Sequence, residues 1–198
     1  TAQYIQTLQA QLRQTPNDPN RLTLLAQAYI QQVRENGDPG NYTLAEKALQ
    51  KALKLAPRSA DALDVMANLQ FARHRFAESL ALAQRAQAIN PAKATTYGLI
   101  GDDLVELGRF DEAVPVYQRM VNLRPDLSSY SRVSYARELS GDIPGAIAAM
   151  QRAVVAGGPN AENIAWTQVY LGNLYLNYTG DLASAADAYR KALVTYLN

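Results

Sequence analysis

Residues 94–125 read ATTYGLIGDDLVELGRFDEAVPVYQRMVNLRP, and this stretch decides the fold. It holds two apolar helical patterns, at 94–107 and 110–123, with a glycine-containing turn between them. Other apolar helical segments end in the same way, and the prolines that follow them are spaced 34 residues apart: Pro57, Pro91 and Pro125. A fixed period of this length predicts a helical hairpin that repeats along the chain.

Small residues recur at matching places in five successive hairpins. The first helix of each hairpin has one such position, occupied by Ala26, Ala67, Gly101, Ser134 and Gly172. The second helix has two, occupied by Ala45, Ser79, Ala113, Ala146 and Ala185 and then by Ala52, Ala86, Met120, Ala153 and Ala192. Small side chains let neighbouring helices approach closely, and the larger residues between them fill the remaining space.

This arrangement, together with LGNLY at 171–175, resembles the tetratricopeptide repeat family over essentially the whole chain. The resemblance implies an all-α, right-handed superhelical solenoid with one continuous core. We expect a single domain over 1–198, in which one extra helix precedes five helix-turn-helix repeats. The predicted ranges are 1–15 for the extra helix and 19–57, 60–91, 94–125, 127–157 and 160–198 for the repeats.

Two departures from the period fall where helices join. The first repeat carries seven extra residues within an insertion at 34–41, and 35–40 reads as a turn. Before Trp166, a Gly-Gly-Pro segment stops one helix, and Asn160 is the predicted N-cap of the next. Helical patterns are already under way at Thr1 and still running at Asn198, so we expect a fragment of a longer protein.

Composition argues against several classes of function. The 19 Lys and Arg residues balance 18 Asp and Glu residues, which leaves no basic excess for binding nucleic acid. The chain has no Cys, and its one His, His74, falls in a predicted surface turn, so we expect no catalysis, no cofactor and no metal site. No apolar run reaches about 18 residues, so we expect no membrane insertion within these residues.

The resemblance implies that the first helix of each repeat lines a concave groove that binds partners. Carried over repeat by repeat, it predicts these groove residues: Asp61, Asp64, Asn68, Phe71, Leu99, Asp102, Glu106, Arg132, Tyr135, Trp166, Tyr170 and Asn173. Family members that grip the C-terminal carboxylate of chaperones use Lys, Arg and Asn at several groove positions. Those positions hold Thr23, Gln27, Val65, Thr95 and Leu99 here, so we expect no such clamp.

Acidic residues gather in the middle of the predicted groove, and Arg132 is the nearest opposing charge we expect there. These carboxylates favour a neutral or basic partner segment. The alternative is that they only solvate an exposed helix face.

Aromatic residues lie near the end of the predicted groove. Trp166 and Tyr170 are four residues apart and share a helix face, and Tyr135 precedes them by one repeat. Such residues are typical of binding hot spots. The alternative is that Trp166 packs as local core under the extra turn before it.

The leading hypothesis is a non-catalytic protein-interaction scaffold that binds a peptide or partner protein in the groove. Its apolar anchors would be Phe71, Leu99, Tyr135 and Tyr170. One alternative is a regulatory or targeting segment of a larger enzyme or of a membrane-anchored assembly factor. Another is self-association through apolar helix faces at the two ends.

Overall fold

The computed structural model describes residues 1–197, which form eleven α-helices, one π-helical turn and no strand. This count equals the one that the repeat pattern predicts, and the all-α repeat architecture confirms the predicted fold class. The helices pack as two compact units, Thr1–Leu107 and Gly108–Asn198.

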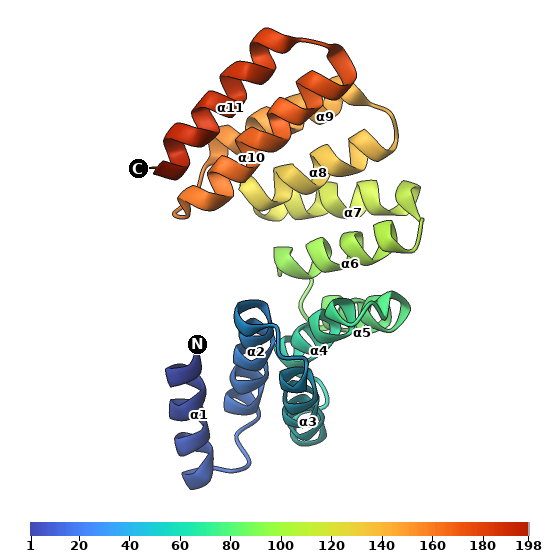
Figure 1. Cartoon of the computed structure of the whole chain (residues 1–198). Helices are drawn as coiled ribbons and strands as arrows, with labels where there is room; N and C mark the ends of the chain where they lie inside the picture. The colour runs from blue at the N-terminus through green and yellow to red at the C-terminus, as the bar shows by residue number, and fades with distance from the viewer. Residues whose placement is uncertain (198) are drawn as a thin grey trace. The chain divides into compact units, whose positions relative to one another are not determined.

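The first unit consists of six helices, each packed against the next along the chain (Figure 1). Helices α2 and α3 form one hairpin, α4 and α5 form the next, and α4 also contacts α6. The bounds are α1 Ala2–Gln14, α2 Pro19–Asn36, α3 Gly40–Leu55, α4 Ala60–Ala72, α5 Phe76–Ile89 and α6 Ala94–Glu106.

The second unit contains five helices and the π-helical turn, labelled η1. Helices α8 and α9 pair closely, as do α10 and α11, and α8 also contacts α10. The bounds are α7 Phe110–Leu123, α8 Leu127–Leu139, α9 Ile143–Ala156, α10 Ala161–Leu174, η1 Tyr175–Thr179 and α11 Leu182–Leu197.

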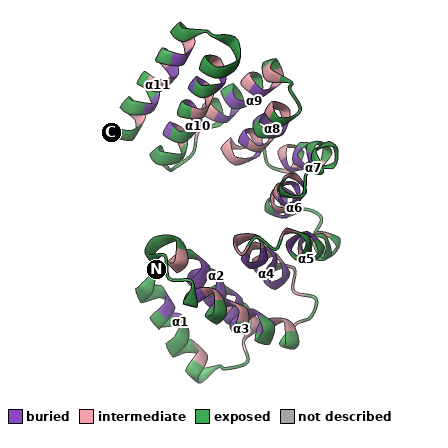
Figure 2. Cartoon of the chain, turned by 45° about the vertical axis from the view of Figure 1, so that its right-hand side comes forward, coloured by how far each residue is buried: buried purple, intermediate pink, exposed green. Residues whose placement is uncertain are grey.

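The core of each unit lies between helices, on the faces that meet their neighbours (Figure 2). Many of the predicted small positions are completely buried: Ala26, Ala45, Ala52, Ala67, Ala113, Ala146 and Ala153. Larger side chains such as Leu49, Tyr117 and Met150 fill the space beside them. The backbones approach so closely that Ser134 of α8 donates a hydrogen bond to the carbonyl of Ala146 in α9, at 2.8 Å. Small residues therefore set the helix spacing in both units.

Local capping explains where several helices begin and end. The Asn160 side chain accepts hydrogen bonds from the amides of Glu162 and Asn163, as its predicted role as the N-cap of α10 requires. In the inserted region, α2 continues through Asn36, and Gly37 ends it in the left-handed conformation with φ 71°. The predicted turn at 35–40 was therefore too long, because the helical hydrogen bonding extends to the glycine.

The repeat pattern predicts that the tyrosines at five packing positions lie in the core: Tyr29, Tyr97, Tyr117, Tyr175 and Tyr189. Tyr29, Tyr97 and Tyr117 are buried, whereas Tyr175 and Tyr189 are half-buried. That expectation was wrong for Tyr175 and Tyr189, because their hydroxyls extend outward to the exposed side chains of Gln151 and Asn173.

Candidate functional site

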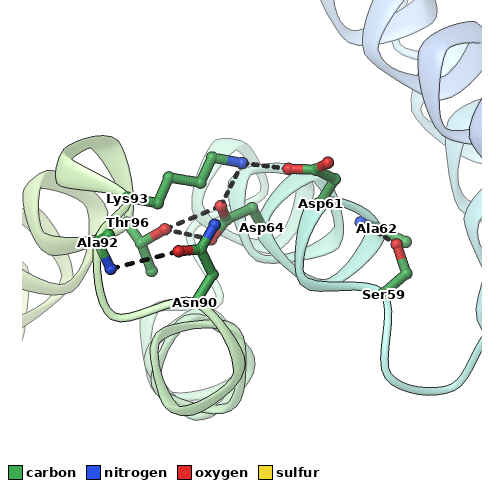
Figure 3. A network of polar contacts seen from close by, with 8 residues as sticks. All are labelled: Ser59, Asp61, Ala62, Asp64, Asn90, Ala92, Lys93 and Thr96. Carbon is green, nitrogen blue, oxygen red and sulfur yellow. Dashed lines mark hydrogen bonds and ion pairs between the residues drawn. The ribbon is translucent and has the colours of Figure 1, made fainter.

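A polar network joins α4 to the start of α6 in the first unit (Figure 3). Lys93, the N-cap residue of α6, contacts Asp61 at 2.6 Å and Asp64 at 2.7 Å. The hydroxyl of Thr96 lies 3.0 and 2.8 Å from the two carboxylate oxygens of Asp64. Two of the predicted groove acids therefore bridge neighbouring first helices of the repeats.

Burial separates the two acids of this network. The Asp64 side chain is 11% exposed and the Asp61 side chain is 74% exposed. Partial burial lowers the pKa of Lys93, but its hydrogen bonds to Asp61 and Asp64 outweigh that effect, so the pKa lies above its ordinary value. The expectation that Arg132 is the nearest opposing charge was wrong for these acids, because the α4–α6 packing brings Lys93 to them.

The other predicted groove residues of the first unit differ in exposure. Asn68, Phe71, Leu99 and Asp102 are half-buried, and Glu106 is exposed. The Phe71 ring packs edge-on against Phe76, with 5.3 Å between ring centroids. Its predicted role as an anchor for a partner thus competes with a role in packing within the hairpin.

Sequence reasoning missed a buried carboxylate beside this surface. Asp103 of α6 is fully buried, and its Oδ2 accepts a hydrogen bond of 2.8 Å from Ser79 of α5. Its Oδ1 has no hydrogen-bond partner. Burial raises the pKa of Asp103 to about 7 against the opposing effect of the Ser79 hydrogen bond, and the charges of Asp102 and Glu106 raise it further. In the sequence, nothing distinguishes Asp103 from the adjacent Asp102, so the pattern did not indicate that Asp103 faces the core.

An aromatic cluster lies on α8, α10 and η1 of the second unit: Tyr135, Trp166, Tyr170 and Tyr178. The rings of Trp166 and Tyr170 lie 5.2 Å apart between centroids, tilted by 42°. Trp166 is 53% exposed and Tyr135 is 42% exposed. The alternative that Trp166 is local core was wrong, because more than half of the residue is exposed to solvent.

Glu138 of α8 fixes two members of this cluster, and sequence reasoning missed it as well. The Tyr170 hydroxyl donates a hydrogen bond to Oε2 of Glu138, and the Tyr178 hydroxyl donates one to Oε1 at 2.9 Å. Burial, and then the hydrogen bond to Glu138, raise the pKa of Tyr170. The hydrogen bond to Glu138 also raises the pKa of Tyr178.

The contacts share a sequence separation but not a repeat register. Glu138 and Tyr170 are 32 residues apart, and the same separation joins Asp61 to Lys93 and Asp64 to Thr96. Equivalent small positions are 34 residues apart between α4 and α6, at Ala67 and Gly101, but 38 apart between α8 and α10, at Ser134 and Gly172. The same separation of 32 therefore joins different repeat positions in the two units.

The two remaining predicted groove residues also make contacts within the second unit. Arg132 is half-buried and donates hydrogen bonds to the carbonyl and the hydroxyl of Ser128, one turn earlier in α8. Asn173 is exposed and accepts a hydrogen bond of 2.8 Å from the Tyr189 hydroxyl of α11.

His74 is an exposed turn residue with φ 58°, packed edge-on against the Phe76 ring. Among residues 1–197, no group of three or more His, Asp or Glu side chains is placed to hold a metal ion. No helix in this part of the chain is both long enough and apolar enough to cross a membrane.

Family comparison agrees with the packing pattern. The model of the tetratricopeptide repeat matches residues 31–94 and 99–162, which is more than half of the sequence. The chain belongs to the tetratricopeptide repeat family. No curated protein sequence matches it significantly. Members of this family serve broadly as scaffolds for protein–protein interaction, which gives the general class of activity.

Solved tetratricopeptide repeat structures share this fold at low sequence identity. A thermophilic protein of Thermus thermophilus, TTC0263, is 21% identical with a TM-score of 0.68, covering 86% of this chain and 91% of its own. YrrB, described as having an unusual peptide-binding site, is 18% identical with a TM-score of 0.63, covering 95% and 91%. A chain of the Cut9-Hcn1 hetero-tetramer of the APC/C is 17% identical with a TM-score of 0.80, and the match covers 96% of this chain and 36% of that one.

Proposed function

We propose that this tetratricopeptide repeat chain is a non-catalytic scaffold that binds a protein or peptide segment on the first helices of its repeats. The observation that carries the proposal is the exposed Trp166 on α10, whose ring contacts the ring of Tyr170 at a tilt of 42°. Large aromatic residues dominate binding energy when a partner covers them, because they bury much apolar area and lose little side-chain entropy.

Preorganisation strengthens this argument. Tyr170 is held from α8 by Glu138, and its ring in turn contacts Trp166. A partner that packs against these rings would therefore immobilise fewer free rotamers than it would on an isolated exposed tryptophan. Tyr135 and Val169 add further exposed apolar surface for a partner, at 42% and 40% exposure.

We propose a preference for neutral or basic partner segments. In the first unit, Asp61 and Glu106 expose carboxylates, although Lys93 offsets part of the charge of the α4–α6 network. In the second unit, Glu138 places a further carboxylate within the aromatic cluster. An acidic C-terminal peptide would meet like charge on both surfaces, and neither offers the basic residues of a carboxylate clamp.

The experiment is affinity capture from cells that contain the protein, comparing the native chain with the double variant Trp166→Ala, Tyr135→Ala. The control is Val155→Ala on the second helix α9, where the valine is 87% exposed. All three proteins must first show equal helical circular dichroism. A partner retained by the native chain and the control and lost by the double variant supports the proposal. Equal recovery in all three contradicts it.

Self-association is a second candidate, and exposed apolar residues of α11 favour it. Leu182, Leu193, Tyr196 and Leu197 are between 59% and 73% exposed, although side chains of these types are usually buried. The substitution Leu193→Ser should then lower the average mass measured by light scattering at high protein concentration. A native chain that stays monomeric across the concentration range contradicts this candidate.

A further inference from the structure

Glu138 is held in an unusual way for a carboxylate on a repeat surface. Each of its two oxygens accepts a hydrogen bond from a phenol: Oε2 from Tyr170 and Oε1 from Tyr178. The two donors come from different elements, α10 and η1, so the carboxylate of α8 lies where three elements meet. A carboxylate oxygen has two acceptor sites, so each oxygen can still receive a second donor.

Its charge is not matched by a cation in the described part of the second unit. Four other carboxylates of that unit have Lys or Arg partners: Glu112, Asp126, Asp142 and Asp187. Glu138 forms no such ion pair, and its hydrogen bonds come from neutral phenols. The negative charge is therefore stabilised but left without an opposite charge.

Two aromatic residues contact this carboxylate through their hydroxyls, and further aromatic residues lie next to Tyr170. Tyr135 lies close enough to Tyr170 to act electrostatically on its hydroxyl, and the Trp166 ring contacts the Tyr170 ring at a tilt of 42°. Ring faces carry negative electrostatic potential, and indole is the strongest of them in attracting cations. A phenol that donates to a carboxylate becomes richer in electrons, so the same hydrogen bonds make the tyrosine rings better partners for a cation.

Ionisation of the phenols does not undo the arrangement at neutral pH. The pKa of Tyr170 is raised by burial and by Glu138, and the pKa of Tyr178 is raised by its hydrogen bond to Glu138. Both tyrosines consequently remain protonated donors. A further negative charge, Glu162, is exposed in the first turn of α10, four residues before Trp166 and thus on the same side of the helix.

We infer that Glu138 and the aromatic cluster form a receptor for one positively charged side chain, the guanidinium of arginine or the ammonium of lysine, in a partner segment. The inference rests on the proposed scaffold function and specifies the chemistry that the scaffold recognises. The cation would lie against the rings and donate to the free acceptor sites of Glu138. Arginine fits best, because its planar group stacks on aromatic rings while its N–H groups reach a carboxylate.

The test uses the single tryptophan of the chain, Trp166, as a fluorescent reporter. The probe is the acetylated and amidated peptide Ala-Arg-Ala-Arg-Ala, titrated at low ionic strength. The control is the same peptide with citrulline in place of each arginine, because citrulline keeps the shape of arginine and removes the charge. We expect a saturable change in Trp166 fluorescence with the arginine peptide. The citrulline peptide should bind at least about fivefold more weakly.

Variants locate the charge that causes this preference. Glu138→Gln keeps an acceptor for a phenol and removes the charge, so it should abolish the preference for arginine over citrulline. Tyr178→Phe should reduce the preference, because the carboxylate loses one of its two fixing hydrogen bonds. Asp111→Asn on α7 makes the same charge change at an exposed acid outside the cluster and should leave the preference intact. Circular dichroism checks that each variant folds.

Three results would overturn the inference: no saturable binding of the arginine peptide, equal binding of both peptides, or an unchanged preference in Glu138→Gln. The scaffold proposal is judged separately by capture with Trp166→Ala, Tyr135→Ala. If that double variant loses its partner while the native chain binds the arginine and citrulline peptides equally, the scaffold stands and only the cation receptor fails.

Discussion

Asp103 is an ionisable residue in an environment that disfavours its charged form. It is fully buried, one oxygen lacks a hydrogen-bond partner, and burial raises its pKa to about 7 from an ordinary 3.8. Between those pH values the folded state binds a proton that the unfolded state has released. The free energy of unfolding should therefore fall as pH rises through this window and level off above about 7.

Asp103→Asn should remove this part of the pH dependence. Thermal unfolding at about pH 5 and pH 8 measures it, and the variant should gain on the order of 2 kcal/mol relative to the native chain at the higher pH. Asp111→Asn, an exposed acid, is the control and should unfold in parallel with the native chain. An Asp103→Asn variant with the native pH slope contradicts this assignment.

Asp64 and Asp61 make a matched pair of predictions within the α4–α6 network. Asp64→Ala should lower the free energy of unfolding by about 1–3 kcal/mol, because it leaves Thr96 and Lys93 without their shared acceptor at a site that is 11% exposed. Asp61→Ala, at 74% exposure, should cost at most about 0.5 kcal/mol. Urea unfolding distinguishes them, and equal losses would show that burial does not set the contribution of each acid.

Residue-level contacts were harder to predict than the helices that carry them. The sequence placed Tyr135, Trp166 and Tyr170 near one another, and the structure shows the Trp166–Tyr170 contact. It gave no indication that Lys93 or Glu138 takes part, because a Lys after a turn and a Glu on a helix are ordinary surface residues. Their roles depend on side-chain reach between first helices, and repeat periodicity describes backbone positions only.

At the scale of elements, the contact between α10 and α11 depends on Gly172. A Cβ built on Gly172 would lie 2.4 Å from Cε1 and 2.8 Å from Cδ1 of Tyr189. The Tyr189 ring cannot move freely, because its hydroxyl is hydrogen-bonded to Asn173. The glycine is thus needed for close packing, as its small-residue position in the repeat pattern predicted.

Gly172→Ala should lower the free energy of unfolding by about 1–3 kcal/mol through overpacking. Gly158→Ala is the control, since that glycine has open space around its Cβ position and a negative φ. Thermal denaturation followed at the helical signal provides the measurement. A Gly172→Ala chain as stable as the Gly158→Ala chain would mean that the Tyr189 ring moves aside at no cost.

Element boundaries could be predicted where a local signal exists. Asn160 was identified correctly as the cap of α10, because a capping side chain acts within one turn. The end of α2 was misplaced, because Asn36 has a weak helical preference but still completes the last turn before Gly37. Periodicity predicted the pairing of helices well, since close packing demands small residues at fixed intervals.

At the scale of the whole molecule, the repeat pattern explains the fold class, and the surfaces of the first helices account for the proposed activity. In each unit, side chains of adjacent first helices interact, Asp64 of α4 with Thr96 of α6 and Glu138 of α8 with Tyr170 of α10. In the first unit this produces a largely satisfied polar bridge, and in the second an exposed aromatic surface around an unpaired carboxylate. We therefore expect the second unit to contribute more binding energy per residue than the first.

Site-specific photo-crosslinking tests this central claim most directly. A benzoylphenylalanine placed at Val169, which is 40% exposed in α10, reports on the first-helix surface, and the same residue at Val155 in α9 reports on a second helix. The account predicts that, in cells containing the protein, partner proteins are crosslinked from position 169 and not from 155. Crosslinking from 155 with none from 169 would contradict it and place the interaction surface on the second helices.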